Sequence, residues 1–141
     1  MESNGSTGPV VVLTGGTRGI GYGLAEAFLE RGCSVVISGR NEGAVAEAVR
    51  RLEAATPGRA AGTACDVREV RDVQSLWDFA AGRFGRVDVW INNAGIGQPQ
   101  SDVDALDPDL VGNIFATNCA GALYGCKVGL AGMKAAGRGA V

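Results

Sequence analysis

A glycine-rich stretch near the start of the chain, residues 14–21 (TGGTRGIG), constrains the fold more than any other part of the sequence. An apolar run, residues 10–13, precedes it, and a helical pattern of apolar residues beginning at Ile20 follows it. This order predicts a buried strand, a tight turn, and a helix whose first N–H groups and dipole face an anion. Four of the eight residues are glycine, so a diphosphate can approach the backbone without meeting side chains. The alternative is an ordinary strand-to-helix turn of an α/β protein.

Strand and helix patterns alternate along the rest of the sequence. Strands are predicted at residues 9–13, 33–38, 60–65 and 87–92. Helices are predicted at 20–31, from a cap at Asn41 to a stop before Thr56, at 70–84, and from a cap at Asp107 to about Met133. Such alternation predicts an α/β fold, a Rossmann-type parallel sheet with helices on both faces. The sequence ends where a fifth strand would begin.

Length, charge and composition narrow the class of protein. The 141 residues predict a flexible tail at 1–8 and one dinucleotide-binding domain at 9–141. The net charge of −2, without a basic run, gives no reason to expect a nucleic-acid partner. No apolar run approaches the roughly 18 residues of a membrane span, so no membrane partner is expected. The absence of histidine removes the commonest general base and metal ligand, and no metal site is expected.

The cysteines and glycines have simple interpretations at this stage. The four cysteines are far apart and lie in apolar segments, so we interpret them as reduced packing residues of a cytoplasmic protein: Cys33, Cys65, Cys119 and Cys126. The 23 glycines exceed the usual share of about 7%. Those scattered through the last third are interpreted as an effect of genomic base composition as much as of structure.

Four motifs in a fixed order give the chain a family resemblance. They are TGGTRGIG at 14–21, Asp66-Val67 after the third strand, NNAG at 92–95, and Asn118 within ATNCAG. With these the chain resembles the short-chain dehydrogenases/reductases. The resemblance implies strand order 3-2-1-4, a nicotinamide coenzyme, a small-molecule substrate, and homo-oligomers in full-length members. The strings CDVRE at 65–69 and DVWINNAG at 88–95 look most like the plant chlorophyll(ide) b reductase branch, for which a plastid location is an alternative.

The glycine-rich loop is expected to hold the coenzyme diphosphate. Gly15 makes the turn, Gly19 lets the backbone close on phosphate, and Gly21 lets the helix pack on the strand. Thr17 and Ile20, in the same loop, are included in the predicted coenzyme site.

The end of the second strand indicates which coenzyme binds. An acid there would hold a ribose 2′-hydroxyl and repel a 2′-phosphate, but this chain has Ser38 and Arg40. Arg18 adds a second cation inside the glycine-rich loop, and a pair of arginines suits a phosphate dianion. We therefore predict NADP(H) in preference to NAD(H). The alternative is two solvated surface arginines.

Residues after the third and fourth strands complete the predicted coenzyme site. The resemblance implies that Asp66 accepts a hydrogen bond from the adenine amino group and that Val67 lies against the ring. The alternative for Asp66 is a helix cap or a surface acid. The resemblance also implies that Asn92 stabilises the sheet and that Ala94 and Gly95 lie near the ribose. A structural role for Asn92 fits the need of buried amides for partners.

Asn118 is the one catalytic residue that the resemblance implies, holding a water in a proton relay to a lysine. The alternative is a buried polar contact of its helix. The family also uses a serine and a YxxxK pair, yet neither Tyr22 nor Tyr124 has a lysine four residues later. The sequence thus favours the NADP(H)-binding portion of a reductase, which we take to be part of a longer enzyme. A non-catalytic binding module or sensor, and a half-enzyme completed by another chain, stay open.

Overall fold

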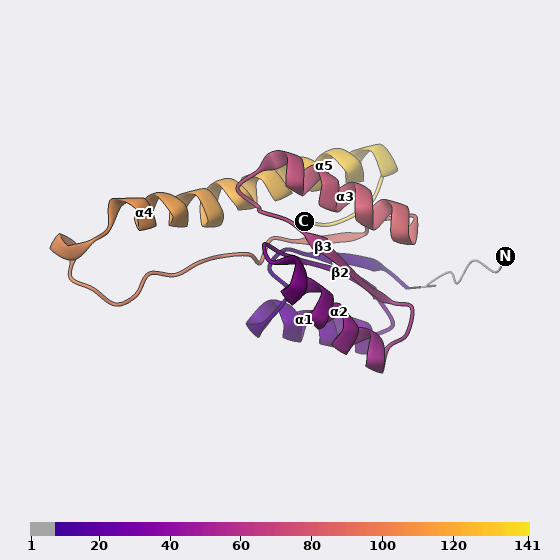
Figure 1. Ribbon diagram of the computed structural model, residues 1–141. Coiled ribbons are helices and arrows are strands. Elements are labelled where there is room, and N and C mark those ends of the chain that lie inside the picture. Colours follow the sequence, from indigo (N-terminus) through magenta and orange to yellow (C-terminus); the bar gives the residue numbers. More distant parts are fainter. Residues whose placement is uncertain (1–7) are drawn as a thin grey trace.

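The computed structural model describes residues 8–141 and contains a four-stranded sheet with helices on both sides (Figure 1). The predicted tail at 1–8 lies almost wholly outside these residues. The elements in chain order are β1 (Val10–Leu13), α1 (Gly19–Glu30), β2 (Ser34–Gly39), α2 (Glu42–Ala55), β3 (Ala60–Ala64), α3 (Val70–Phe84), β4 (Val89–Ile91), the 3₁₀ turn η1 (Val103–Ala105), α4 (Pro108–Ile114), the π-helical turn η2 (Phe115–Ala120) and α5 (Gly121–Ala136).

The sheet is parallel throughout, with strand order β3-β2-β1-β4. Val11 of β1 pairs with Val35 of β2 on one side and with Val89 of β4 on the other. All four residues of β1 are buried, as expected for a central strand covered on both faces. The predicted Rossmann-type fold and its 3-2-1-4 order are confirmed.

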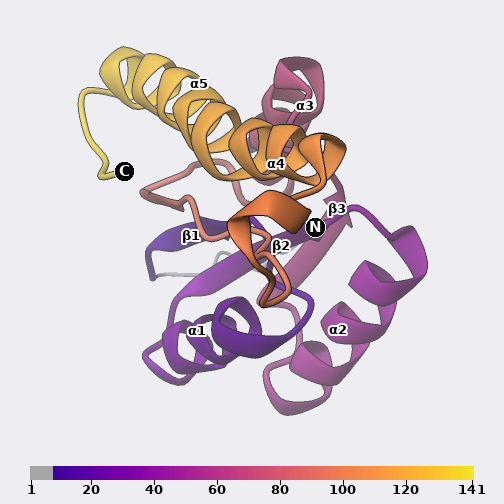
Figure 2. The ribbon, with the colours of Figure 1, turned by 90° about the vertical axis from the view of Figure 1, so that its left-hand side faces the viewer.

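Two apolar layers fix the helices to the sheet. Figures 1 and 2 show α1 and α2 on one face and α3 with α5 on the other. The first layer contains Val11, Leu13, Leu29, Ile37 and Leu52, and the second Val12, Val36, Leu76, Trp90 and Met133. The alternation of side chains along β1 sends successive residues to opposite layers. The shared carboxyl end of the strands is left open for a ligand.

The last long helix is not the single α-helix that the sequence predicts. The π-helical turn η2 separates α4 from α5, and the N–H of Gly121 bonds to the carbonyl of Ala116, five residues earlier. The predicted start is confirmed, since Asp107 caps α4 by accepting from the N–H of Asp109, followed by Pro108 at the first turn. Asn41 likewise caps α2, through the N–H of Ala44.

Glycines of α5 allow the helix to pack closely on tryptophans of the other elements. A Cβ on Gly125 would lie 1.8 Å from Oδ1 of Asn92 and 2.7 Å from Nε1 of Trp90. A Cβ on Gly132 would lie 2.0 Å from the indole of Trp77. At these two positions the glycines have a packing role. Of the two explanations given for the scattered glycines, base composition and structure, structure applies at Gly125 and Gly132.

Backbone hydrogen bonds place Ala140 beside β4. Its N–H donates to the carbonyl of Asp88 at 3.0 Å, and its carbonyl accepts from the N–H of Trp90 at 2.9 Å. The bridge to Val89 is parallel, as the next strand of this sheet would be. The expected position of a fifth strand next to β4 therefore agrees with the structure.

The cysteines differ in their surroundings. Cys33 and Cys65 are buried and Cys126 is half-buried, as predicted for packing residues. The interpretation is wrong for Cys119, which lies on η2 and is exposed.

No group of residues suited to a metal ion, and no helix long and apolar enough to cross a membrane, occurs within residues 8–141.

Candidate functional site

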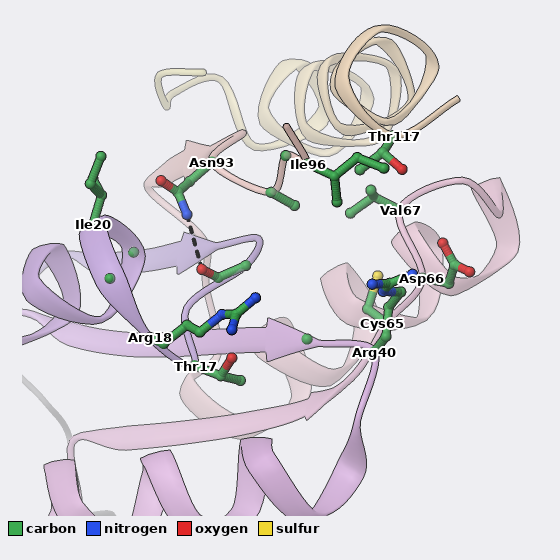
Figure 3. A pocket seen from close by; sticks show the side chains of 16 residues that line it. Thr17, Arg18, Ile20, Arg40, Cys65, Asp66, Val67, Asn93, Ile96 and Thr117 are labelled. Carbon is green, nitrogen blue, oxygen red and sulfur yellow. Dashed lines mark hydrogen bonds between the residues drawn. The ribbon is translucent and has the colours of Figure 1, made fainter. Parts of the chain in front are cut away.

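A cleft of about 380 Å³ opens at the carboxyl ends of the strands, between the loop after β1 and the turn η2 (Figure 3). Its lining brings together segments that are as much as 102 residues apart in the sequence, from Gly15 to Thr117. The lining residues are Gly15, Thr17, Arg18, Gly19, Ile20, Gly21, Gly39, Arg40, Cys65, Asp66, Val67, Asn93, Ala94, Gly95, Ile96 and Thr117. This is the position where open parallel sheets bind ligands.

The glycine-rich loop forms one wall of the cleft with its bare backbone. Gly15 and Gly19 have φ angles of 71° and 58°, which L side chains rarely adopt. A Cβ on Gly19 would have no atom within 4 Å, so the backbone there faces open space. A Cβ on Gly21 would lie 2.2 Å from the carbonyl oxygen of Gly15, so this glycine allows the start of α1 to pack on the loop.

The amino end of α1 offers its N–H groups to the cleft. Arg18 at the N-cap makes no capping side-chain bond, and the first turn holds no acid. The first N–H groups of the helix therefore keep their positive potential for an external anion. Together with the bare glycine backbone, this fits the diphosphate of a dinucleotide.

An asparagine that the predicted site omitted locks the loop to the sheet. Nδ2 of Asn93 donates to the carbonyls of Thr14 and Gly15, at 3.1 and 2.9 Å. The backbone N–H groups of Asn93 and Ala94 both donate to Oγ1 of the buried Thr14. The ends of β1 and β4 are thus joined directly under the cleft. The signal in the sequence was the pair of amides after an apolar strand, since a buried amide needs partners.

Two arginines line the cleft with unengaged guanidinium groups. Arg18 lies on the glycine-rich loop and Arg40 follows β2, and both are exposed. Within residues 8–141, neither guanidinium has a hydrogen bond or ion pair to another residue. No acid stands at the end of β2, and the charge of Arg40 helps to lower the pKa of Asp66, the acid of the same cleft.

Asp66 is the acid of the cleft, and it is engaged by Arg68. Nε and Nη2 of Arg68 contact the Asp66 carboxylate, the shortest at 2.6 Å, and the N–H of Arg68 bonds to the same group. The Arg68 hydrogen bonds hold the pKa of Asp66 below its ordinary value, although burial opposes this. Asp66 therefore stays ionised and can accept a hydrogen bond from a ligand amino group.

Cys65 lies behind Asp66 and is not a candidate nucleophile. Burial, and then the charges of Asp72 and Asp66, raise the pKa of its thiol to about 12. A thiol that stays protonated at neutral pH neither attacks an electrophile nor binds a metal as thiolate.

Three residues of the predicted site do not line the cleft. Ser38 is buried in β2, with its hydroxyl 3.5 Å from the carbonyl of Leu13. Asn92 accepts from Nε1 of Trp90 and donates to Sγ of Cys126, which is a structural contact between β4 and α5. The third residue is Asn118 on η2.

Asn118 is exposed, and its amide is paired with the backbone of Ile96. Oδ1 accepts from the N–H of Ile96 and Nδ2 donates to its carbonyl, both at 2.8 Å. This bidentate contact fixes the chain after β4 at the edge of the cleft. It differs from the buried helix contact that we considered as the alternative.

Five residues that line the cleft were not part of the predicted site, namely Gly39, Cys65, Asn93, Ile96 and Thr117.

A family model described as short chain dehydrogenase matches residues 9–141. The chain belongs to this family. The match covers all of the elements above, and it confirms the resemblance predicted from the glycine-rich loop, Asp66-Val67 and the NNAG motif.

Relatives and solved structures within the family support the same assignment. The chain is 38% identical over 132 residues to chlorophyll(ide) b reductase NOL, chloroplastic, of Oryza sativa, covering 92% of this chain and 38% of the relative. It is 36% identical over 121 residues to L-fucose dehydrogenase of Oryctolagus cuniculus, with 86% and 41% covered. The likeness to the chlorophyll(ide) b reductase branch is therefore confirmed.

A solved structure of 3-ketoacyl-(acyl-carrier-protein) reductase from Brucella melitensis, complexed with NADH, matches with a TM-score of 0.85 and 28% identity. The match covers 92% of this chain and 52% of that protein. The chain thus spans about two fifths to one half of the length of these family members.

Proposed function

We propose that residues 9–141 are the NADP(H)-binding domain of an oxidoreductase that transfers hydride between the nicotinamide and a carbonyl or alcohol carbon. The cleft supports a dinucleotide through the bare Gly19 backbone and the uncapped amino end of α1. The observation that carries the coenzyme choice is the pair Arg18 and Arg40, both on the cleft and both without a protein partner in the described part of the chain.

In this proposal each part of the cleft binds a different part of the coenzyme. The loop from Gly15 to Gly21 holds the diphosphate, and Arg18 with Arg40 holds the 2′-phosphate. Asp66 accepts from the adenine amino group, and Val67 covers the ring. Ala94 and Gly95 leave room for the second ribose because their side chains are small or absent.

When bound, the nicotinamide supplies the hydride donor or acceptor. Asn118 is proposed to contribute to a proton relay in the complete active site, beyond its bond to Ile96. The serine and the YxxxK pair of the family have no counterpart in the 141 residues, and we propose that a further part of a longer protein supplies them. A binding module without catalysis, or a half completed by another chain, is the alternative. Hydride transfer by a longer form of the protein, and none by these 141 residues alone, would favour the first proposal.

The proposed coenzyme choice is tested by titrating the chain with NADPH and NADH and following nucleotide fluorescence. We expect NADPH to bind more tightly. Arg18→Ala and Arg40→Ala should each weaken NADPH binding by about 10-fold or more, because each removes a charge-assisted bond to phosphate, and leave NADH binding nearly unchanged. Arg50→Ala is the matched control, since Arg50 pairs with Glu47 on α2 outside the cleft. Tighter binding of NADH, or equal losses for both nucleotides, would contradict the proposal.

We also propose that the protein forms homo-oligomers through the outer face of the helix from α4 to α5. Phe115, Leu123 and Leu130 lie there with exposed fractions of 63%, 68% and 47%. Leu123 and Leu130 are seven residues apart on α5, which puts them on one side of that helix, and Phe115 is at the start of η2. An apolar row of this kind is better covered by a second copy than left in water.

The location of the protein stays a prediction. A cytoplasmic protein is expected from the reduced cysteines, while the two chlorophyll(ide) b reductase NOL relatives carry the word chloroplastic in their names. Fractionation of source cells, with an antibody against the chain, separates the two.

A further inference from the structure

The segment at 97–114 stands apart from the sheet, and within residues 8–141 one side-chain hydrogen bond joins it to the rest of the molecule. In Figures 1 and 2 the loop after β4 and helix α4 extend beyond the layers that cover the sheet. No residue of α4 is buried. Among residues 8–141, the hydrogen bond from Nη1 of Arg68 to Oδ1 of Asn113, 3.0 Å long, is the side-chain hydrogen bond that joins this segment to the rest of the molecule.

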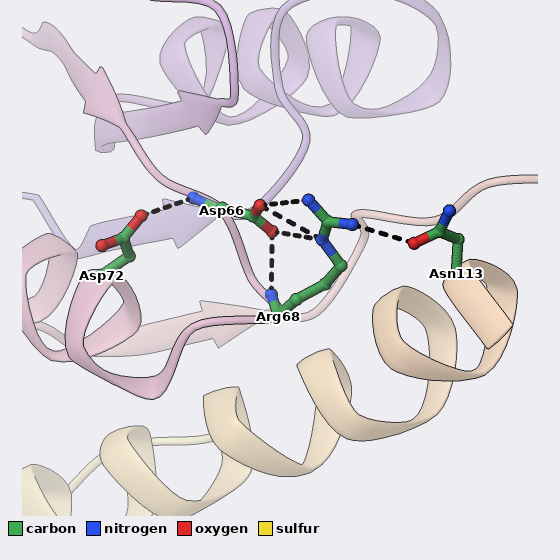
Figure 4. A network of polar contacts seen from close by, with 4 residues as sticks. All are labelled: Asp66, Arg68, Asp72 and Asn113. Carbon is green, nitrogen blue, oxygen red and sulfur yellow. Dashed lines mark hydrogen bonds and ion pairs between the residues drawn. The ribbon is translucent and has the colours of Figure 1, made fainter. Parts of the chain in front are cut away.

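Arg68 uses the rest of its guanidinium on the cleft. Nε lies 3.0 and 3.1 Å from the two carboxylate oxygens of Asp66, and Nη2 lies 2.6 Å from Oδ2 (Figure 4). One planar, rigid group therefore contacts a residue of the cleft on one side and α4 on the other. We call Asp66, Arg68 and Asn113 the Arg68 bridge.

Two further hydrogen bonds hold Asp66 in place, so a displacement of its carboxylate also moves Arg68. Its backbone N–H donates to Oδ2 of Asp72 on α3, and its carboxylate accepts from the backbone N–H of Arg68. Both contacts fix the direction in which the carboxylate points into the cleft. A ligand that bonds to the carboxylate thus meets an acceptor whose free positions are set by Arg68.

We propose that Arg68 is a positioning residue that couples the Asp66 end of the cleft to helix α4 and the loop before it. The coupling rests on the proposed binding of an adenosine group at Asp66. A ligand that immobilises the Asp66 carboxylate also immobilises Arg68, and through Asn113 it restrains residues 97–114. By linkage, the ordered segment strengthens binding of the ligand by the same factor.

The coupling gives the two ends of the cleft a route of communication. Ile96, which directly precedes the segment, lines the cleft, whereas Asn113 lies near the carboxyl end of α4. The segment between them carries the loop that follows β4. Occupancy of the adenosine end therefore helps to shape the wall next to the position where a substrate would enter.

Hydrogen exchange tests the coupling directly. Amide exchange of residues 97–114 is measured in the 141-residue chain, with and without saturating NADPH, and NADPH should slow it. Asn113→Ala should abolish this slowing while changing the NADPH dissociation constant by no more than about threefold, because one exposed hydrogen bond is lost. Gly112→Ala is the matched control. It also introduces an alanine into α4, where no atom lies within 4 Å of the new Cβ, and it should keep the effect.

A second variant reports on the cleft side of the bridge. Arg68→Met should abolish the slowing and also weaken NADPH binding by about tenfold, because the carboxylate loses its positioning partner. If Asn113→Ala keeps the NADPH-dependent slowing, the coupling is overturned while coenzyme binding stands. If the unaltered chain binds neither NADPH nor NADH, the proposed function fails and the coupling with it. Exchange without nucleotide should still be faster in Asn113→Ala than in the unaltered chain.

Discussion

Glycine serves this molecule in two different ways. Gly19 leaves the backbone of the loop open toward the cleft, whereas Gly125 lets α5 pass close to polar atoms of β4. The first use leaves room for a ligand, and the second makes room for the protein itself. Both roles depend on the missing Cβ, and substitution by alanine distinguishes one role from the other.

Gly125→Ala should destabilise the fold strongly. The new Cβ would lie 1.8 Å from Oδ1 of Asn92, so that amide and the Trp90 indole must move and their hydrogen bond is lost. We expect a loss of about 2 kcal/mol or more in the free energy of unfolding, measured by urea denaturation.

Gly23→Ala is the control for this substitution. Gly23 lies on α1, and a Cβ added there would have no atom within 4 Å. Alanine should there stabilise the chain by about 0.5–1 kcal/mol through helix propensity. Equal effects of the two substitutions would refute the packing role of Gly125.

At the residue scale, the residues of the cleft that could be predicted from the sequence are those that belong to a motif at a strand end. Arg18 and Arg40 could be placed on one cleft because each lies at a fixed distance from a strand end. Arg68 could not be found in this way, since its partner Asn113 is 45 residues away and on a helix face that the pattern does not specify. Ser38 shows the converse. It lies near the end of β2, as the site requires, but because side chains alternate between the two faces of a strand, its hydroxyl is buried in the core.

At the scale of elements, Asp88 joins three parts of the sheet edge. Its carboxylate accepts from the N–H of Val10, which begins β1, and pairs with Arg86 and with Arg138 beyond α5. Burial alone would raise the pKa of Asp88, but the hydrogen bonds from Arg86 and Val10 outweigh it and lower the pKa. The ionised form is therefore the one that the fold favours.

The stability that Asp88 contributes should depend on pH. Because its pKa is lower in the folded chain, the contribution is complete above the unfolded value of about 3.9 and is lost as the pH falls through the folded value. Asp88→Asn should thus be less stable than the unaltered chain at pH 7 and nearly equal to it well below a pH of about 3.9. Urea denaturation over this pH range measures the difference. A difference that stays constant with pH would show that charge has no part in it.

The elements themselves were predictable, apart from one break. The strands and the first three helices follow from apolar periodicity and from caps such as Asn41. The π-helical turn was not predictable, because residues 108–136 are rich in glycine and alanine and their apolar pattern is too weak to reveal a shift of one residue. Asn118, a poor helix former in that pattern, is the only hint, and a polar contact or a catalytic group accounts for it equally well.

At the scale of the whole molecule, we propose that copies meet through the exposed residues Phe115, Leu123 and Leu130 of η2 and α5. Leu123→Lys should weaken self-association by at least about tenfold, because it places a charge in the apolar contact. Sedimentation velocity over a range of concentrations measures this. Val103→Lys is the control, since Val103 is also exposed but lies on η1, outside the row. A chain that stays monomeric at high concentration would contradict the proposed contact.

The turn η2 sets the angular relation between two faces of one long helix. An α-helix advances by about 100° per residue, so a turn closed by a bond over five residues shifts all that follows by roughly that angle. Thr117 thereby faces the cleft while Gly125 still meets Trp90. Deletion of a single residue from the turn would leave the sequences of α4 and α5 intact, but it would rotate the faces of these two helices relative to each other. A change in the number of residues in this turn would therefore require the contact between α5 and the sheet to be rebuilt.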